Sequence, residues 1–263
     1  MDGGILNPYF PTVRDAQASA WRNVLDGFLN LVYPEACFVC ATPTDRRQDC
    51  GVCDDCWGKI LGLHLEGPIC PSCGTPLPGF ALGSTSLCLE CVRQAPPYSG
   101  ARSFGYYSME MRRLVHELKF EGRRSLAELA APLLARAFFD SWRREDFDAV
   151  TAVPLHPSRR RERGYNQSKL LARELARKVA IPEVEALKRV TATRPQVGLT
   201  DAQRQENVRK AFRCARPEAV AGKRLLLVDD VMTTGATVSC AAQALLDAGA
   251  ERVSVLTVAR AIR

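Results

Sequence analysis

Two adjacent carboxylates, Asp229 and Asp230, follow directly after the apolar run 225–228. An uninterrupted apolar run of this length is typical of a strand that is buried on both faces of a parallel sheet. Ligands bind at the carboxyl edge of such sheets, so the acidic pair is expected at a binding edge. Small and hydroxyl-bearing residues then lead into an apolar-periodic helix, and they are Thr233, Thr234, Gly235, Ala236 and Thr237.

This loop has the chemistry of a site for a sugar phosphate. Backbone N–H groups at a helix N-terminus are unpaired and carry partial positive charge, which suits a phosphate. Gly235 allows a close approach of the backbone, and the threonines add hydroxyl donors. Carboxylates repel phosphate, so Asp229 and Asp230 suit sugar hydroxyls, directly or through Mg²⁺ and water. A capping Asp or Thr in an ordinary turn would explain only one of these residues.

The segment 227–237 resembles the phosphoribosyl-pyrophosphate (PRPP) loop of type I phosphoribosyltransferases. The resemblance implies an α/β fold, with a type I phosphoribosyltransferase-like parallel sheet flanked by helices. It also implies that Asp229 and Asp230 face the ribose and that residues 233–237 hold its phosphate. It does not establish transfer, because some members of this fold bind without catalysing.

Nine of the eleven cysteines lie within residues 37–91, and most form Cys-x-x-Cys pairs. Two such pairs can complete a closed tetrahedral zinc site, which leaves no open position for catalysis. Sequential pairing therefore predicts a double zinc ribbon with two structural zinc ions. The ligands of the first are Cys37, Cys40, Cys53 and Cys56, and those of the second are Cys70, Cys73, Cys88 and Cys91.

Cys50 makes the first set ambiguous, because it stands at the same spacing from Cys53 as Cys53 does from Cys56. We favour the Cys53/Cys56 pair, since Trp57 and the apolar residues after it continue that pair as a helix. A disulfide framework would need an oxidising compartment. A thioredoxin-type motif would be a single pair, and an iron–sulfur cluster suits the even pairing less well. Zinc would replace a core that about 55 residues would struggle to build.

A second buried-strand candidate, 148–154, is followed by an arginine-rich segment, which again indicates an anion. In phosphoribosyltransferases a loop after an early strand holds the pyrophosphate. Here the residues predicted for that loop are Leu155, His156 and Arg159, with Arg160 and Arg163 as further candidates. The arginines could instead face solvent or nucleic acid, and His156 could be a general base or a structural residue.

The polar segment 190–213 is interrupted by Gly and Pro. It is expected to close over PRPP and to exclude water from an oxocarbenium-like transition state. Arg194 and Arg204 are the candidates to clamp the pyrophosphate there. Further strands are expected over 101–107 and 252–258.

Helical spacing of apolar residues predicts helices over 16–32, 109–120 and 168–179. Ser125-x-x-Glu128 predicts a capping box at the start of another helix. We divide the chain into an N-terminal amphipathic helix segment, the double zinc ribbon and the phosphoribosyltransferase-like domain. Their ranges are 1–35, 36–97 and 98–263.

The formal net charge of +7 is unevenly distributed. Residues 1–100 hold six of the 36 Lys and Arg residues and ten of the 29 Asp and Glu residues, a net charge of −4. Residues 101–263 hold the remaining 30 and 19, a net charge of +11. The basic part therefore contains the phosphate loop, which suits PRPP or nucleic acid, although solvated helix faces account for some of the arginines.

Composition limits the location of the protein. Hydrophobic residues make up 46% of the chain and charged residues 25%, as in folded soluble proteins. No apolar run approaches the ~20 residues of a membrane helix, and the N-terminus shows no secretory signal pattern. A cytoplasmic protein without a transmembrane segment is expected.

Taken together, the chain resembles the ComF family of competence proteins over about residues 30 to 260. Members of this family join an N-terminal cysteine ribbon to a phosphoribosyltransferase domain. Besides the cysteine pairs and the loop 227–237, the matching segments are 118–122, 154–157, 161–167, 193–199 and 204–208.

The ComF resemblance implies a role in natural transformation, in handling incoming single-stranded DNA or in the use of DNA as a nutrient. DNA-uptake or helicase proteins are the expected partners.

We expect a PRPP-binding, phosphoribosyltransferase-like protein that acts in DNA uptake, and two classes of function remain open for it. The first is an enzyme that binds Mg²⁺ and PRPP and transfers phosphoribose to a nitrogen nucleophile, and Asp229, Asp230, Arg194 and Arg204 would serve catalysis. The second is a non-catalytic protein that binds single-stranded DNA, for which aromatic side chains would stack on bases. The aromatic candidates are Tyr106, Tyr107, Phe120 and Tyr165.

Overall fold

The computed structural model describes residues 35–44, 51–78, 86–190 and 211–262 of the chain. It divides into two compact units, residues 1–62 and residues 63–263. The division falls inside the segment expected to hold both zinc ribbons, so the second ribbon shares a unit with the sheet. The predicted helix 16–32, Cys50 and the segment with Arg194 and Arg204 lie outside the described residues.

The first unit contains a short antiparallel pair, β1 (Glu35–Ala36) and β2 (Pro43–Thr44), and the helix α2 (Asp54–Gly62). Two aspartates in the first turn of α2 favour its N-terminus, where the helix dipole is positive. Cys56 and Ile60 are one helical turn apart and are both buried. The prediction that a helix continues from the Cys53/Cys56 pair is therefore confirmed.

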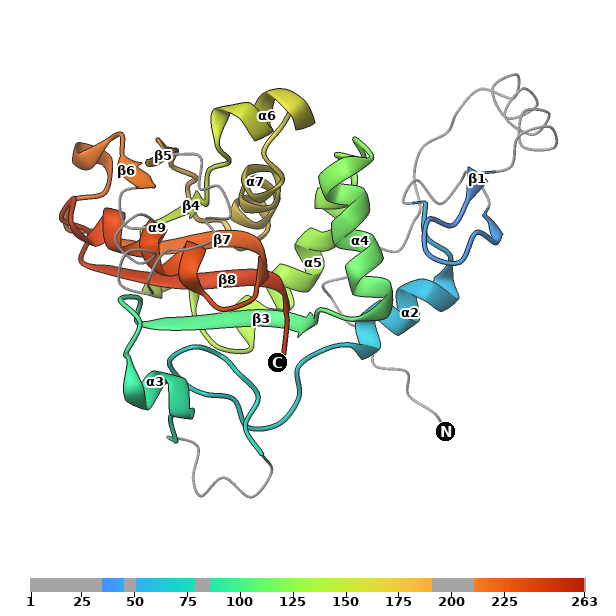
Figure 1. The fold of residues 1–263 in the computed structure, drawn as a ribbon, viewed down its shortest axis with the longest axis horizontal. Helices are drawn as coiled ribbons and strands as arrows, with labels where there is room; N and C mark the ends of the chain where they lie inside the picture. Colours follow the sequence, from blue (N-terminus) through green and yellow to red (C-terminus); the bar gives the residue numbers. More distant parts are fainter. Residues whose placement is uncertain (1–34, 45–50, 79–85, 191–210, 263) are drawn as a thin grey trace, which may run out of the picture. The chain divides into compact units, whose positions relative to one another are not determined.

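The second unit is built on a four-stranded parallel sheet in the order β3-β8-β7-β4 (Figure 1). The predicted apolar run 225–228 lies on the interior strand β7, and its four residues are buried. β8 lies between β7 and β3, so β7 and β8 are the two central strands, and most of their residues are buried. The strand bounds are β3 Gly100–Tyr106, β4 Ala149–Ala152, β7 Arg224–Met232 and β8 Arg252–Arg260.

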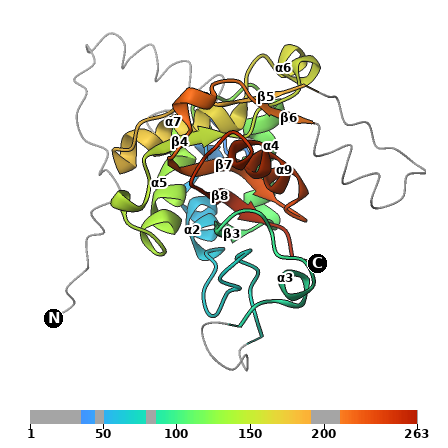
Figure 2. The same cartoon turned by 90° about the vertical axis from the view of Figure 1, so that its left-hand side faces the viewer.

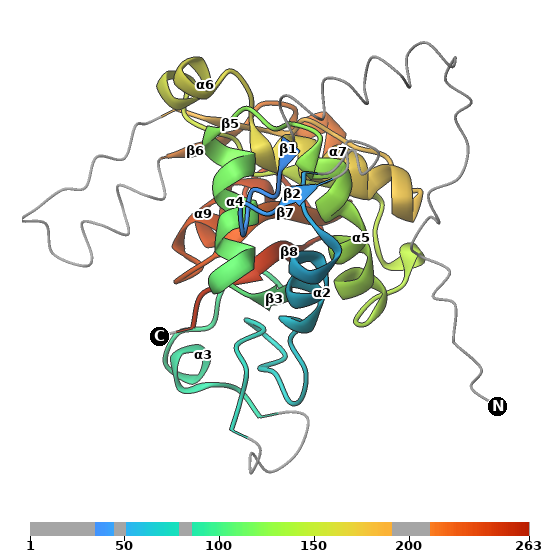
Figure 3. The ribbon, with the colours of Figure 1, turned by 90° about the vertical axis from the view of Figure 1, so that its right-hand side faces the viewer.

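Helices cover the two faces of this sheet. The helices α5 (Leu126–Phe139) and α7 (Gln167–Val179) pack together on one face. The helix α9 (Ala236–Leu246) packs on the other face, beside the antiparallel pair β5 (Leu187–Arg189) and β6 (Phe212–Cys214). Figures 2 and 3 show this layering from two sides, with α9 and α5 on opposite sides of β7 and β8.

The remaining elements are short or lie at the edge of the layers. The helix α4 (Met109–Phe120) packs against α5, and it buries the apolar face that the sequence predicts. The helix α3 (Leu89–Arg93) follows Cys88, and α6 (Pro157–Arg163) follows β4. Two 3-10 turns complete the order, η1 (Arg144–Asp146) and η2 (Pro217–Ala219).

The predicted capping box at Ser125 is wrong. Ser125 has helical backbone angles, and its side chain makes no capping hydrogen bond. The tight turn that starts at Gly122, which has a φ of 70°, already runs into helical geometry before Ser125.

An ion pair fixes the start of β4 to the start of β7. The Asp148 carboxylate accepts hydrogen bonds from the backbone N–H of Arg224 at 2.8 Å and from its guanidinium at 3.0 and 2.8 Å. These hydrogen bonds lower the pKa of Asp148 to about 2.

None of the helices in the described ranges has the length and apolar character needed to span a lipid bilayer.

Candidate functional site

The acidic pair lies inside β7, because this strand continues to Met232 and does not end at Val228 as predicted. β8 extends alongside it, so that Val231 and Met232 still pair with Ala259 and Arg260. Both acids are therefore held on a rigid element. Asp229 is 9% exposed and Asp230 is 4% exposed.

Asp229 is held by two short hydrogen bonds to one oxygen. Its Oδ1 atom accepts the Ser168 hydroxyl at 2.7 Å and the backbone N–H of Asp230 at 2.9 Å. Burial and the adjacent charge of Asp230 raise the pKa of Asp229 to about 7, while Ser168 and the charge of Lys119 act in the opposite direction. A carboxyl with this pKa changes charge in the physiological range, which is frequent at functional sites.

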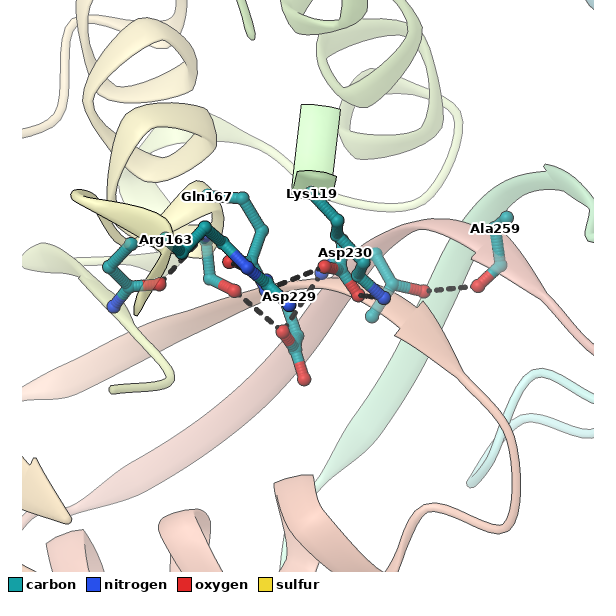
Figure 4. A network of polar contacts seen from close by, with 9 residues as sticks. Lys119, Arg163, Gln167, Asp229, Asp230 and Ala259 are labelled. Atoms are coloured by element: carbon teal, nitrogen blue, oxygen red, sulfur yellow. Dashed lines mark hydrogen bonds and ion pairs between the residues drawn. The ribbon is translucent and has the colours of Figure 1, made fainter. Parts of the chain in front are cut away.

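Asp230 is bound from two sides, as Figure 4 shows. Lys119, near the end of α4, places its Nζ atom 2.9 Å from Oδ1. Gln167, the first residue of α7, donates from Nε2 to Oδ2 at 2.8 Å, and its own Oε1 accepts Arg163 Nη1 at 2.6 Å. The contacts Arg163–Gln167–Asp230–Lys119 thus join the helices α4, α6 and α7 to the carboxyl end of β7.

The predicted phosphate loop, residues 233–237, is open on its outer side. Thr233, Thr234, Ala236 and Thr237 are exposed, and Gly235 forms the N-cap of α9 with a φ of 81°. A Cβ atom at Gly235 would lie 2.9 Å from Met232 Cε. The positive φ favours glycine at this position, whereas the close neighbour is only the flexible end of the Met232 side chain. The backbone conformation is therefore a more specific reason for Gly235 than the close approach expected from the sequence.

The predicted pyrophosphate loop contains the N-cap of helix α6. His156 is the N-cap of α6, where its Nδ1 atom accepts the backbone N–H of Ser158 at 3.3 Å. Leu155 is half-buried and Arg159 is exposed. Their assignment to pyrophosphate stays a prediction, as does that of Arg194 and Arg204.

Four functional candidates were not identified from the sequence: Lys119, Gln167, Ser168 and Arg189. The first three contact the acids directly, as described above. Arg189 on β5 is close enough for its charge to interact with those of Asp229 and Arg159, and burial lowers its pKa. Lys119 and Gln167 lie in the segments 118–122 and 161–167, which carry the family resemblance. Their position in these segments is the sequence signal that could have identified them.

The aromatic candidates differ in exposure. Tyr165 is buried, and its hydroxyl donates to the carbonyl oxygen of Leu118 at 2.5 Å, so its candidacy for base stacking is wrong. Phe120 is 57% exposed, and the Arg163 guanidinium lies 4.8 Å from the centre of its ring. Tyr106 and Tyr107 are half-buried.

The cysteines form the two predicted sets, and within each set the four sulfur atoms lie within 4.8 Å of one another. Cys40 and Cys53 sulfurs are 3.7 Å apart, and Cys73 and Cys88 sulfurs are 3.6 Å apart. The edge of a ZnS₄ tetrahedron with 2.3 Å bonds is about 3.8 Å. These distances fit zinc ligands, and a disulfide would need about 2 Å.

The fold and the two cysteine sets define a class of protein that joins zinc ribbons to a phosphoribosyltransferase fold. Residues 28–92 match the model of the double zinc ribbon domain, and residues 163–263 match that of the phosphoribosyl transferase domain. The cysteine sets are accordingly two structural zinc sites.

Relatives narrow this class to a family. "DNA utilization protein YhgH" of Salmonella typhi is 34% identical over 237 residues, which cover 88% of this chain and 100% of that protein. "Competence protein F" of Haemophilus influenzae is 32% identical over 216 residues, with 80% and 91% covered. "Competence protein ComFC" of Bacillus subtilis is 28% identical over 224 residues, with 81% and 86% covered. The chain belongs to the ComF family.

Proposed function

We propose that this protein binds PRPP with Mg²⁺ at the carboxyl end of β7 and acts in DNA uptake and utilisation. The observation that carries the proposal is the pair of buried carboxylates followed directly by the open loop 233–237 at the N-terminus of α9. The names of the relatives, which refer to competence and DNA utilisation, support the process in which it acts.

Each of the two acids would bind the ribose in an orientation set by a different neighbouring side chain. Asp229 is oriented by Ser168, and Asp230 by Gln167. A ribose hydroxyl that hydrogen-bonds to Asp230 would compete with the Lys119 ammonium, which would then turn towards the phosphate groups. Oxygen ligands such as these carboxylates suit Mg²⁺, which would offset the charge of the pyrophosphate. Residues 233–237 would hold the 5′-phosphate through backbone N–H groups and hydroxyls.

A transferase activity would use the same parts. Pyrophosphate would leave the anomeric carbon, and a nitrogen nucleophile would form the new bond there. The protein would contribute positioning and charge stabilisation, in which Arg159 and Arg163 are suited to the developing negative charge. Release of pyrophosphate in the presence of candidate acceptors measures this activity.

Calorimetric titration with PRPP and Mg²⁺ tests the binding proposal. We expect the wild type to bind, and the variant Asp229→Asn/Asp230→Asn to lose at least about tenfold in affinity, because each lost charged hydrogen bond contributes about 1.5–3 kcal/mol. Asp55→Asn, at an exposed position of α2, is the matched control and should bind as the wild type does. Absence of binding by the wild type would refute the proposal.

Binding of single-stranded DNA is a second candidate, and the exposed Phe120 beside Arg163 favours it. An exposed ring with an adjacent guanidinium can stack on a base and contact the backbone. Fluorescence anisotropy with a labelled oligothymidylate should show at least about fivefold weaker binding by Phe120→Ala. Phe139→Ala, which removes another exposed phenylalanine, should have no effect. Equal affinities of the wild type and Phe120→Ala would exclude this surface.

A further inference from the structure

The second cysteine cluster is built into the edge of the sheet. In its first turn the N–H of Gly74 donates to the carbonyl of Cys70 at 2.8 Å. The same turn pairs with β3, because the N–H of Ala101 donates to the carbonyl of Ser72 at 2.8 Å. Gly74 has a φ of 72°, and a Cβ atom there would lie 2.4 Å from the carbonyl oxygen of Ala101. The metal-binding turn and β3 are therefore in backbone contact.

Arg260 reaches this cluster from the end of β8. It is 7% exposed. Its Nη1 atom donates to the carbonyl of Cys73 at 2.6 Å, while its Nη2 atom lies 3.7 Å from Cys73 Sγ and donates to the Thr75 hydroxyl. Four thiolates and one Zn²⁺ carry a net charge of −2, so a buried guanidinium is suited to this place. A donor to a ligand sulfur of this kind tunes the affinity for the metal.

The same guanidinium also contacts the strand that carries the acidic pair. Arg260 Nη1 lies 3.1 Å from Met232 Sδ, and the two residues are register partners on β7 and β8. The N–H of Ala261 donates to the carbonyl of Met232 at 2.9 Å. Met232 is 2% exposed, and its Cε atom occupies the space beside Gly235, at the start of the phosphate loop.

We propose that the second zinc cluster supports the phosphate loop, and that Arg260 is the positioning residue that connects them. The Nη1 atom of Arg260 contacts both the Cys73 carbonyl and Met232 Sδ, while Nη2 lies beside Cys73 Sγ. Met232 in turn packs beside Gly235. Loss of zinc or oxidation of this cluster would then release the loop 232–238. The consequence for PRPP rests on the proposed function, whereas the structural connection does not.

The two clusters provide a matched pair of variants. Cys40 and Cys73 are each the second cysteine of their turn, and each sulfur lies 3.1 Å from the hydroxyl of the threonine two residues later. Cys40→Ser and Cys73→Ser therefore remove the same ligand from equivalent turns. Arg260→Gln tests the connection with all zinc ligands in place, and Arg260→Lys keeps the charge but loses the forked geometry.

Hydrogen–deuterium exchange of the full chain with zinc bound is the first readout, because it needs no PRPP. In Cys73→Ser and Arg260→Gln, amides 232–238 should exchange at least about tenfold faster, with a smaller increase in Arg260→Lys. In Cys40→Ser these amides should exchange as in the wild type. Unchanged exchange of 232–238 in Arg260→Gln, or an equal increase in Cys40→Ser, would overturn the inference.

The second readout is the exchange of zinc with and without PRPP. Coupling between two sites is reciprocal, so saturating PRPP should slow the chelator-induced loss of zinc from Cys40→Ser, which keeps the second cluster. In Arg260→Gln this protection should be lost. Zinc loss that PRPP slows equally in Arg260→Gln would overturn the role of Arg260. A wild type that binds no PRPP would refute the proposed function alone, because the exchange of 232–238 would still decide the connection.

Discussion

The two cysteine turns have the same internal hydrogen bonds but different surroundings. In the first, the N–H of Cys37 donates to Thr42 and that of Ala41 donates to Cys37; in the second, Cys70 and Gly74 repeat both bonds, and all four are 2.8 Å long. One residue differs at the left-handed position, Ala41 with a φ of 61° and Gly74 with a φ of 72°.

This difference shows that the spacing of metal ligands does not predict what a metal-binding turn contacts. Alanine is tolerated at the left-handed position of the first turn at a cost of about 1 kcal/mol. In the second turn the backbone of β3 leaves no space for a Cβ atom. The Cys-x-x-Cys spacing predicts the metal in both turns, whereas only the contacts with β3 and Arg260 show what the second metal supports.

Among the variants that test this contrast, Gly74→Ala should have the largest effect. We expect it to destabilise the second unit by about 3 kcal/mol, because the added methyl group meets backbone atoms of β3 that have little room to move. Denaturant unfolding followed by peptide-resolved hydrogen exchange measures the change in each unit separately. A decrease of less than about 1 kcal/mol in the free energy of unfolding would mean that the added methyl group fits beside β3.

Asp229→Asn is expected to stabilise the second unit at pH 8 by about 2 kcal/mol. The pKa of Asp229 is raised to about 7, so the native state keeps a proton that the unfolded chain loses near pH 4. Wild-type stability should therefore fall as the pH rises from about 4 to 7, and the difference from the variant should vanish below pH 4. Unfolding curves at several pH values measure it, and a variant that is less stable at pH 8 would contradict the raised pKa.

Ala41→Gly should have the smallest effect. It relieves the left-handed alanine of the first turn and should leave the stability of the first unit unchanged or raised by less than about 1 kcal/mol. Competition for zinc with a chromogenic chelator measures the zinc affinity of the variant. A marked loss of zinc affinity would show that this turn is as tightly constrained as the second one.

Local pattern predicted much of the fold. The apolar run 225–228, the buried face of α4 and the two cysteine sets depend on spacing within a few residues, and the structure has all of them. The extent of β7 beyond Val228 could not be predicted in this way, because it depends on pairing with β8.

The contacts of the site are long-range. Gln167 and Asp230 are 63 residues apart, and Arg260 and Cys73 are 187 residues apart. Such pairs depend on the strand order β3-β8-β7-β4, which hydrophobic periodicity does not determine. The sequence therefore singled out the acids and the loop 233–237 as candidates. It did not single out Lys119, Gln167 and Ser168, which contact the acids, or Arg260, which contacts Met232.

The most direct test of the account is calorimetric titration of PRPP and Mg²⁺ into the wild type, Cys40→Ser and Cys73→Ser under identical conditions. We predict that the wild type and Cys40→Ser bind with affinities within about twofold of each other, and that Cys73→Ser loses at least about tenfold. Equal affinities of the two cysteine variants, or a wild type that does not bind, would contradict the account.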